Sequence, residues 1–248
     1  DTDSLYIVNP SKEQQKKIIN FARTNYNIDL EVDKEYRYVM FSQLKKNYLG
    51  VKTNGKLDIK GLVGKKSNIP KFIRIGFNEV CMVLQSVNSP QELEVAKQQV
   101  SDVIRDSYIK LDKLDYPLED FAFNHMIQKN PHKYGIKKFV SKTRSLFDNN
   151  KVVENYRETN VPPHAKVARQ MEKQGIKIED KMFIPFVKTL GGQVEWIKEA
   201  KLEKIDRPKY KETMRKVFEP LLQVLNMDFD KITEIRKVKT LDEIFFNM

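Results

Sequence analysis

The sequence has almost no cysteine, few histidines and no long apolar run, and each of these absences excludes a class of protein. The single cysteine, Cys81, cannot form an intrachain disulfide and fits a reducing cytoplasm. The histidines His125, His132 and His164 have no cysteine or acidic companions at ligand spacing, so we expect no zinc site. No apolar run approaches the roughly 20 residues of a spanning helix, and the N-terminal residues lack a signal-peptide pattern.

Acidic residues are also in deficit. The 34 Asp and Glu face 45 Lys and Arg, which leaves a formal net charge of +11. Unpaired cations on a folded surface attract polyanions, so we expect a nucleic-acid partner, a place near the nucleoid and no membrane. With 40% hydrophobic and 32% charged residues the chain is globular, and 248 residues allow one or two domains.

The first 69 residues predict a small α+β domain. Residues 5–8 are apolar and β-branched and predict a strand, and Ser11 and Gln14 form a capping box that predicts a helix over 12–26. Further strands are expected at 30–32 and 36–41, and a hairpin over 51–62 that turns at Asn54-Gly55. This arrangement is strand, helix and strand followed by a hairpin.

From Pro70, which we take as a domain boundary, the pattern becomes mainly helical. Helices are expected over 73–84, 89–111, 164–174 and 210–225, the third ending at Gly175. Packing positions in the second are expected at Val95, Val100, Val103, Ile104 and Tyr108. The period of 118–126 is ambiguous, and 149–163 reads as a polar stretch. Residues 182–187 predict a strand with its proline at an edge or bulge, and Gly191-Gly192 a turn.

Two carboxylates, Asp1 and Asp3, precede the first predicted strand. Alternate residues of a strand point to one face, so the pair could supply oxygen ligands to Mg²⁺ in a phosphoryl-transfer site. A solvated turn is the alternative, because Asp-x-Asp is common in simple loops.

The residues Asp1-Thr2-Asp3-Ser4 resemble motif C of the family B DNA polymerases, archaeal type. The likeness continues in order through Lys45-Lys46-Asn47-Tyr48, Lys60-Gly61-Leu62-Val63-Gly64-Lys65-Lys66 and Pro162-Pro163-His164. It implies the end of a palm domain over 1–69, a thumb over 70–236 and a tail over 237–248. In the family the exonuclease, the fingers and a further metal-binding Asp precede motif C.

The resemblance implies a DNA-directed DNA polymerase that adds dNTPs to a primer by two-metal catalysis. Asp3, assisted by Asp1, would bind two Mg²⁺ ions shared with a large partner chain that carries the exonuclease and fingers, and this chain alone would be inactive. A natural split, intein-associated gene splitting, cleavage or truncation would each explain the start at Asp1. The alternative is a non-catalytic DNA-binding or clamp-tethering subunit. A nuclease has little support, since no further acidic cluster is present.

Nine cations between Gln43 and Arg74 accompany one acid, Asp58, and this bias suits phosphate tracking. The alternative is a solvated face. The resemblance carries DNA contact to Lys45, Lys46, Tyr48, Lys60, Lys65 and Lys66. Asn47 stands where the family has Arg, and Lys65-Lys66-Ser67 stands where it commonly has Arg-Arg-Asp.

The tail resembles the peptide that archaeal polymerases dock on a sliding clamp. Leu241 would be the aliphatic anchor, followed by Ile244 and Phe245, with Phe246 closing over them. Val238 stands in for the usual Gln. The alternative is that these side chains pack on the thumb or on the partner chain.

Overall fold

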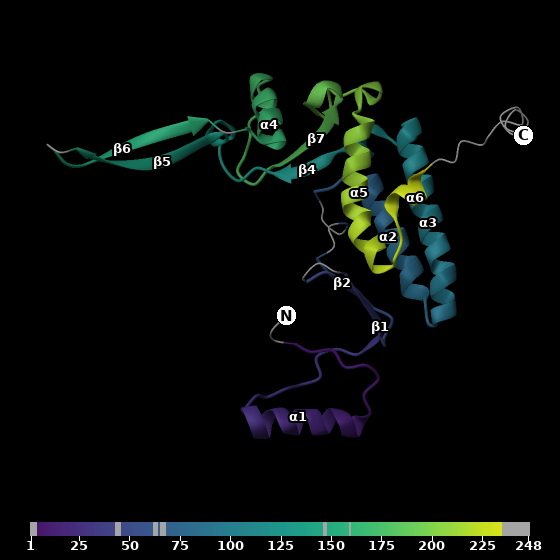
Figure 1. Ribbon diagram of the computed structural model, residues 1–248. Helices are drawn as coiled ribbons and strands as arrows, with labels where there is room; N and C mark the ends of the chain where they lie inside the picture. Colours follow the sequence, from purple (N-terminus) through teal and green to yellow (C-terminus); the bar gives the residue numbers. More distant parts are fainter. Residues whose placement is uncertain are drawn as a thin grey trace, which may run out of the picture. The chain divides into compact units, whose positions relative to one another are not determined.

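The computed structural model describes residues 4–42, 46–61, 64, 68–145, 148–158 and 160–234 (Figure 1). The helices are α1 Lys12–Tyr26, α2 Lys71–Ser86, α3 Pro90–Lys113, α4 Pro163–Lys173, α5 Arg207–Val224 and α6 Phe229–Thr233. The strands are β1 Tyr36–Phe41, β2 Tyr48–Lys52, β3 Leu57–Lys60, β4 Phe123–Met126, β5 Ile136–Ser145, β6 Asp148–Glu158, β7 Phe183–Thr189 and β8 Gln193–Trp196. Helices and antiparallel strands are both present, so the predicted α+β class is confirmed.

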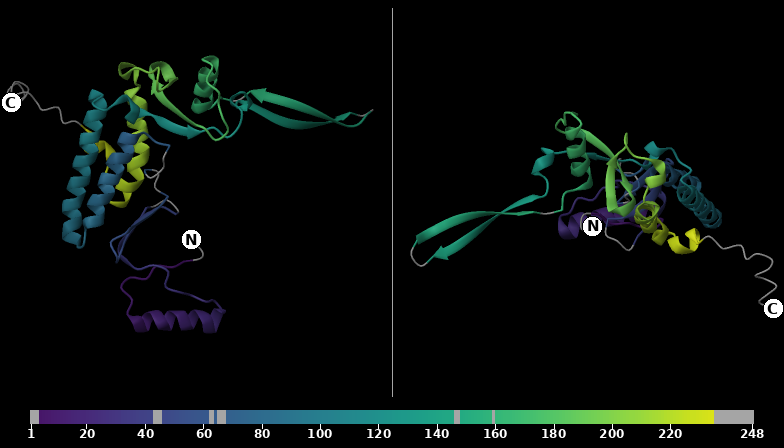
Figure 2. Two further views of the ribbon diagram at one scale, coloured as in Figure 1. Left: turned by 180° about the vertical axis from the view of Figure 1, so that it is seen from behind. Right: turned by 90° about the horizontal axis from the view of Figure 1, so that it is seen from above.

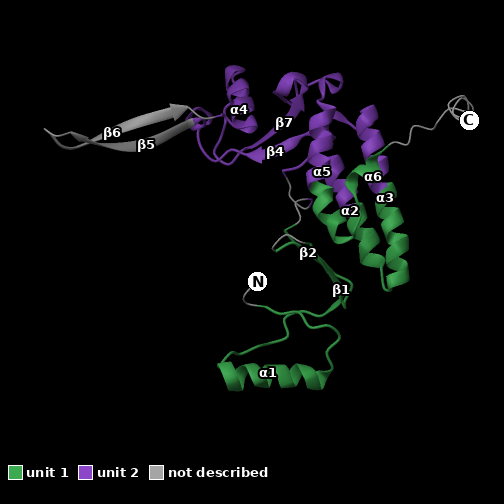
Figure 3. Ribbon diagram, in the orientation of Figure 1, with its two compact units in different colours: residues 1–63, 79–102, 217–248 green, residues 64–78, 103–216 purple. Residues whose placement is uncertain are grey.

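The chain divides into two compact units (Figure 3). Unit 1 contains residues 1–63, 79–102 and 217–248, and unit 2 contains 64–78 and 103–216. Helices α2, α3 and α5 contribute residues to both. The assignment of palm and thumb on either side of Pro70 stays a prediction.

Helix α1 of unit 1 forms where its capping residues predict it. The Ser11 hydroxyl accepts a hydrogen bond from the Gln14 backbone N–H (3.2 Å), and the Gln14 side chain accepts one from the Ser11 backbone N–H (2.8 Å). The helix ends where Asn27 turns left-handed, at φ +54°. The boundaries predicted from sequence, 12–26, are confirmed.

The three strands of unit 1 form one antiparallel sheet in the order β1-β2-β3. The predicted strand at 36–41 and the hairpin turning at Asn54-Gly55 are confirmed. The strands predicted at 5–8 and 30–32 are wrong, because both segments lack regular structure. A strand exists only through hydrogen bonds to a neighbour, and no described strand pairs with either segment.

Unit 2 contains a second antiparallel sheet in the order β4-β7-β8. The predicted strand over 182–187 is confirmed as β7, but its expected edge position is wrong because β7 is the middle strand. Pro185 is tolerated there for a specific reason. Its carbonyl accepts from Ile197 N–H (3.4 Å), one residue beyond β8, so the donor that proline lacks faces the point where the neighbouring strand ends.

Helix α4 covers this sheet by packing on β7 and β8 (Figures 1 and 2). It buries the small and apolar face formed by Ala165, Val167, Ala168 and Met171. The predicted end at Gly175 is confirmed, since its φ of +82° is a conformation that favours glycine.

Strands β5 and β6 pair antiparallel from Ile136↔Glu158 to Ser145↔Asp148. This hairpin was not predicted, because no element was assigned to 136–145 and a polar stretch was assigned to 149–163.

Helices α2 and α3 confirm the predicted helical region. In α3, Val100 and Ile104 are fully buried, whereas Val95 is 62% exposed and the expectation for it was wrong. Ala96, one position further, is buried instead and lies four residues before Val100, on the same helical face.

Tyr210 of α5 lies at the centre of the unit 2 core. Its ring, which is fully buried, contacts the rings of Phe72, Phe121 and Phe123. Its hydroxyl donates to the Phe121 carbonyl (2.8 Å) and accepts from the Lys188 backbone N–H (3.1 Å). One phenol therefore satisfies two backbone groups, and its burial raises its pKa above the ordinary tyrosine value.

We predict that Tyr210→Phe lowers the free energy of unfolding by about 1–3 kcal/mol, because it leaves the Phe121 carbonyl and the Lys188 N–H without a partner. Thermal unfolding followed by the fluorescence of Trp196, the single tryptophan, measures this change within unit 2. Tyr26→Phe, at a side chain that is 65% exposed, is the control. Equal stability of the two variants would contradict the prediction.

Candidate nucleic-acid interface

The hairpin of β2 and β3 presents the described part of the lysine-rich segment. Its turn is closed by the Gly55 N–H donating to the Lys52 carbonyl (2.8 Å) and the Lys52 N–H donating to the Lys56 carbonyl (2.9 Å). The Asn54 side chain accepts from the Lys56 N–H (3.1 Å). The paired register places Tyr48 directly opposite Lys60.

One carboxylate, Asp58, accepts hydrogen bonds from several polar side chains of this sheet. Its Oδ2 accepts from the Tyr36 hydroxyl (2.6 Å), the Tyr48 hydroxyl (3.2 Å) and the Lys34 ammonium (3.0 Å). Burial alone would raise the pKa of Asp58, but the hydrogen bonds from Tyr36 and Lys34 outweigh it and hold the pKa below its ordinary value. Burial and the bond to Asp58 raise the pKa of Tyr36. The carboxylate therefore stays ionised and ties β1, β2 and β3 together.

An aromatic cluster lies beside this carboxylate. The Tyr6 ring is 4.7 Å from Phe41 and 6.3 Å from both Tyr36 and Tyr48, measured between ring centroids. Residues 5–8 thus lie against the sheet through one side chain without pairing with it.

The structure brings two lysine-bearing segments together at Gly61. Gly61 has φ +78°, and a β-carbon there would overlap the Asn47 side chain and come within 2.6 Å of the Lys46 carbonyl oxygen. Lys46 is itself left-handed, at φ +63°. Lys46 and Lys60 are both exposed, and the close approach of Gly61 to the Lys46 carbonyl brings their backbone segments together.

The sheet is attached to the end of α2, within unit 1. Arg37 donates to the Gln85 carbonyl (2.7 Å) and to the Asn88 side chain, and the Tyr38 hydroxyl donates to the Leu84 carbonyl. These carbonyls lie in the last turn of the helix, where no intrahelical donor remains. Capping by Arg37 and Tyr38 therefore fixes the lysine-bearing hairpin on a rigid element.

Of the DNA-contact residues expected from sequence, the structure describes Lys46, Tyr48 and Lys60. The backbone segments of Lys46 and Lys60 are adjacent, whereas Tyr48 is buried and its phenol is bound to Asp58. The other predicted site residues lie outside the described residues: Asp1, Asp3, Lys45, Lys65, Lys66, Leu241, Ile244, Phe245 and Phe246. Their roles stay predictions.

Sequence reasoning missed the role of Asp58. The signal was present, because Asp58 is the one acid in a run of cations. Only the folded sheet shows that the acid serves two tyrosines and Lys34, which come from 10 to 24 residues away.

Comparison with known proteins adds the decisive observation. The family model described as DNA polymerase family B matches residues 1–142, more than half of the chain. The chain belongs to DNA polymerase family B. It is 36% identical to DNA polymerase 1 of Saccharolobus solfataricus over 99% of its length, and 38% identical to DNA polymerase 1 of Sulfolobus acidocaldarius over 94%. It spans about a quarter of each of these relatives (25% and 24%).

The fold agrees with membership in this polymerase family. The solved family B DNA polymerase from the hyperthermophilic archaeon Pyrobaculum calidifontis superimposes with a TM-score of 0.54 at 19% identity, covering 93% of this chain and 25% of that one. At this identity the likeness concerns the fold alone.

Two further findings concern metal binding and membrane insertion. Among the described residues, no group of three or more His, Cys, Asp or Glu side chains is arranged to hold a metal ion. None of the described helices is long and apolar enough to cross a membrane.

We predict that Asp58→Asn lowers the free energy of unfolding at neutral pH by about 1–3 kcal/mol, because three donors lose an ionised acceptor. The difference from the parent protein should vanish in acid. Unfolded Asp58 has the higher pKa and binds a proton first, so this stabilisation is present above about pH 4 and is lost as pH falls through the lower folded pKa.

Urea unfolding at a series of pH values, with hydrogen exchange of β2 and β3 as the local probe, measures this effect. Asp33→Asn is the matched control, because Asp33 is 80% exposed and 3.9 Å from the same Lys34. The same pH dependence for the parent protein and Asp58→Asn would refute the role of Asp58.

We also predict that Gly61→Ala destabilises unit 1 more than Gly55→Ala does. Both glycines have positive φ, so both substitutions carry a backbone cost of about 1 kcal/mol. A β-carbon at Gly55 meets nothing within 4 Å, whereas one at Gly61 must displace the Lys46 backbone. Thermal unfolding measures the loss of stability in each variant, and a DNA-binding assay measures the loss of affinity. Equal losses of stability and affinity in Gly61→Ala and Gly55→Ala would show that Gly61 does not position the Lys46 turn.

Proposed function

We propose that this chain is the part of a DNA-directed DNA polymerase that closes the palm and forms the thumb. The observation that carries this proposal is the identity of 36% to a DNA polymerase 1 over 99% of the chain. The basic β2–β3 hairpin supports it, because exposed Lys46 and Lys60 on a fixed sheet suit contact with a phosphate backbone.

The activity requires the rest of a polymerase, on the same or another polypeptide. An apolar surface supports this requirement, since over residues 4–42 only Ala22 is buried. Nine large apolar side chains in this segment are at least 42% exposed: Leu5, Tyr6, Ile7, Val8, Phe21, Tyr26, Ile28, Val32 and Phe41. A hollow of about 250 Å³ lies between residues 7–10 and α1, lined by Ile7, Val8, Pro10, Gln14, Lys17 and Ile18. A surface this apolar is stabilised when a partner surface covers it.

The proposed reaction is template-directed addition of dNTPs to a primer 3′ end. Asp3, assisted by Asp1, would hold Mg²⁺ together with a carboxylate from the rest of the polymerase, and bound Mg²⁺ would neutralise charge on the reacting phosphates. Lys45, Lys46, Tyr48, Lys60, Lys65 and Lys66 would follow the duplex. Their contribution is positioning, because contacts to phosphate fix register without reading sequence.

The tail would serve processivity. Leu241, with Ile244, Phe245 and Phe246, would form an apolar plug for a groove on a sliding clamp, at the spacing of a docking peptide. The spacing and the two adjacent phenylalanines are the support for this assignment.

We predict that Asp3→Asn reduces nucleotide incorporation by the completed polymerase to background while primer–template affinity stays nearly unchanged. A metal ligand stabilises the transition state far more than it stabilises duplex binding. Primer extension and fluorescence anisotropy measure the two quantities. Asp33→Asn, which removes one exposed carboxylate of unit 1, is the control and should extend primers normally.

Two other outcomes decide between the proposed activity and its alternative. Incorporation that survives in Asp3→Asn would remove Asp3 from catalysis. DNA binding without any incorporation by the completed parent enzyme would identify a non-catalytic DNA-binding subunit.

A further inference from the structure

Lys188, on β7 of unit 2, holds a half-buried ammonium group. The ammonium lies 4.5 Å from the centroid of the Phe123 ring. Among the residues that the structure describes, no carboxylate forms an ion pair with it and no acceptor forms a hydrogen bond with it. Partial burial of an unpaired charge is unfavourable, so this side chain is suited to an anion supplied by a ligand.

The backbone holds Lys188 beside the start of α5. Its N–H donates to the Tyr210 hydroxyl (3.1 Å), and its carbonyl accepts from the Asp206 N–H (3.1 Å). Hydrogen bonds therefore hold both the backbone N–H and the backbone carbonyl of Lys188 in place.

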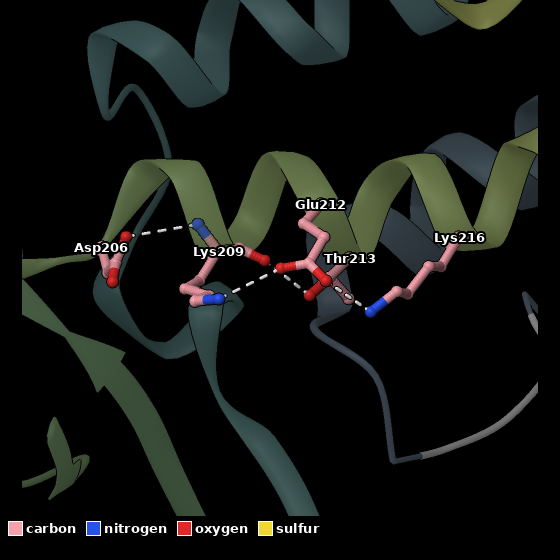
Figure 4. A network of polar contacts seen from close by, with 5 residues as sticks. All are labelled: Asp206, Lys209, Glu212, Thr213 and Lys216. Carbon is pink, nitrogen blue, oxygen red and sulfur yellow. Dashed lines mark hydrogen bonds and ion pairs between the residues drawn. The ribbon is translucent and has the colours of Figure 1, made fainter. Parts of the chain in front are cut away.

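Two more ammonium groups lie along the neighbouring face of α5 (Figure 4). Glu212 accepts from Lys209 (3.3 Å) and from Lys216 (2.6 Å), so one carboxylate holds both lysines. Asp206 is already engaged by the Lys209 backbone N–H (3.2 Å), and the Thr213 hydroxyl donates to the Lys209 carbonyl (2.7 Å). Burial is the main cause that lowers the pKa of Lys188. The positive charges of Lys216 and Lys209 lower this pKa further, whereas the negative charges of Glu212 and Asp206 raise it by less than the total lowering.

Two other lysines in unit 2 each pair with a carboxylate of their own. Lys71 pairs with Asp120 (3.0 Å), and Lys211 pairs with Asp112 (2.6 Å). Lys188, Lys209 and Lys216 differ from these two lysines. Lys209 and Lys216 share one carboxylate, Glu212, and Lys188 has no ion-pair partner among the described residues.

We propose that Lys188, Lys209 and Lys216 form a binding site for the backbone phosphates of primer–template DNA, with Glu212 holding two of the ammonium groups in place. This inference rests on the proposed polymerase function. Lys209 and Lys216 are seven residues apart on one helix, and both ammonium groups reach the Glu212 carboxylate, so they lie on one face of α5. A row of cations along one helix face suits the backbone phosphates of a strand.

The test is fluorescence anisotropy of labelled primer–template DNA with the full chain over a range of salt concentrations. Lys188→Met, Lys209→Gln and Lys216→Gln should each weaken binding and lower the slope of log affinity against log salt by about one. Lys211→Gln is the matched control, with the same change in charge, and should leave the slope unchanged. Cluster variants that bind like this control would overturn the proposal.

Stability gives a second readout. Methionine keeps the apolar stem over Phe123 and removes the unpaired charge, so Lys188→Met should melt no lower than the parent protein while it binds DNA less well. Weaker binding that comes only with a lower melting temperature, in all three cluster variants, would mean that the lysines maintain the fold and would overturn the proposal.

Two further results distinguish a failure of the proposed site from a failure of the proposed polymerase function. A parent chain without measurable DNA affinity would contradict the proposed polymerase function itself, whereas salt-dependent binding by a parent chain with inert cluster variants would contradict only this site. In a third experiment, besides DNA binding and thermal stability, inorganic pyrophosphate is titrated into the protein at constant ionic strength. Direct binding of pyrophosphate that is lost in Lys188→Met, with DNA affinity unchanged, would assign the cluster to a free phosphate ligand instead.

Discussion

The sheet of unit 1 depends on the carboxylate of Asp58. Through the Tyr36 and Tyr48 hydroxyls and the Lys34 ammonium, this group on β3 connects β1, β2 and the segment before β1. A three-stranded sheet of this size has little core of its own, and hydrogen bonds to an ionised, partly buried acceptor are stronger than neutral ones. The strands that carry the proposed DNA interface are therefore held together by an acid.

In unit 1, hydrogen bonds hold the sheet in place, but many apolar side chains are not covered. Arg37 and Tyr38 cap α2 and fix the sheet to it, whereas α1 and residues 5–8 expose apolar side chains on a surface without a core. Both facts suit the proposed place of this segment in a longer polymerase, since the relatives are about four times as long as this chain. Unit 2 is different, because the Tyr210 ring and hydroxyl complete the core of this unit. Its unusual feature is the charge of Lys188, which has no ion-pair partner among the residues that the structure describes.

Local chemistry made several elements predictable. The Ser11 and Gln14 capping box, the Asn54-Gly55 turn and Gly175 each specify a backbone conformation through neighbours within a few residues, and each is found where predicted. The lysine bias between Gln43 and Arg74 likewise pointed to a phosphate-contacting surface. Val95 shows the limit of a periodic pattern, since a shift of one position turns a side chain by about 100° and moves it from the core to water.

By itself, then, the sequence determined the family, the helix ends, the tight turns and the basic character of the chain, because these depend on residue identity and short-range hydrogen bonding. Tertiary structure alone decided what depends on distant partners. Residues 5–8 have strand chemistry, but no described strand pairs with them, and Pro185 occupies a middle strand because β8 ends beside it. Asp58 and Lys188 acquired their roles in the same way. Whether a charge is shared, neutralised or left unpaired is set by which side chains folding brings within about 3–4 Å, and spacing along the chain does not contain that information.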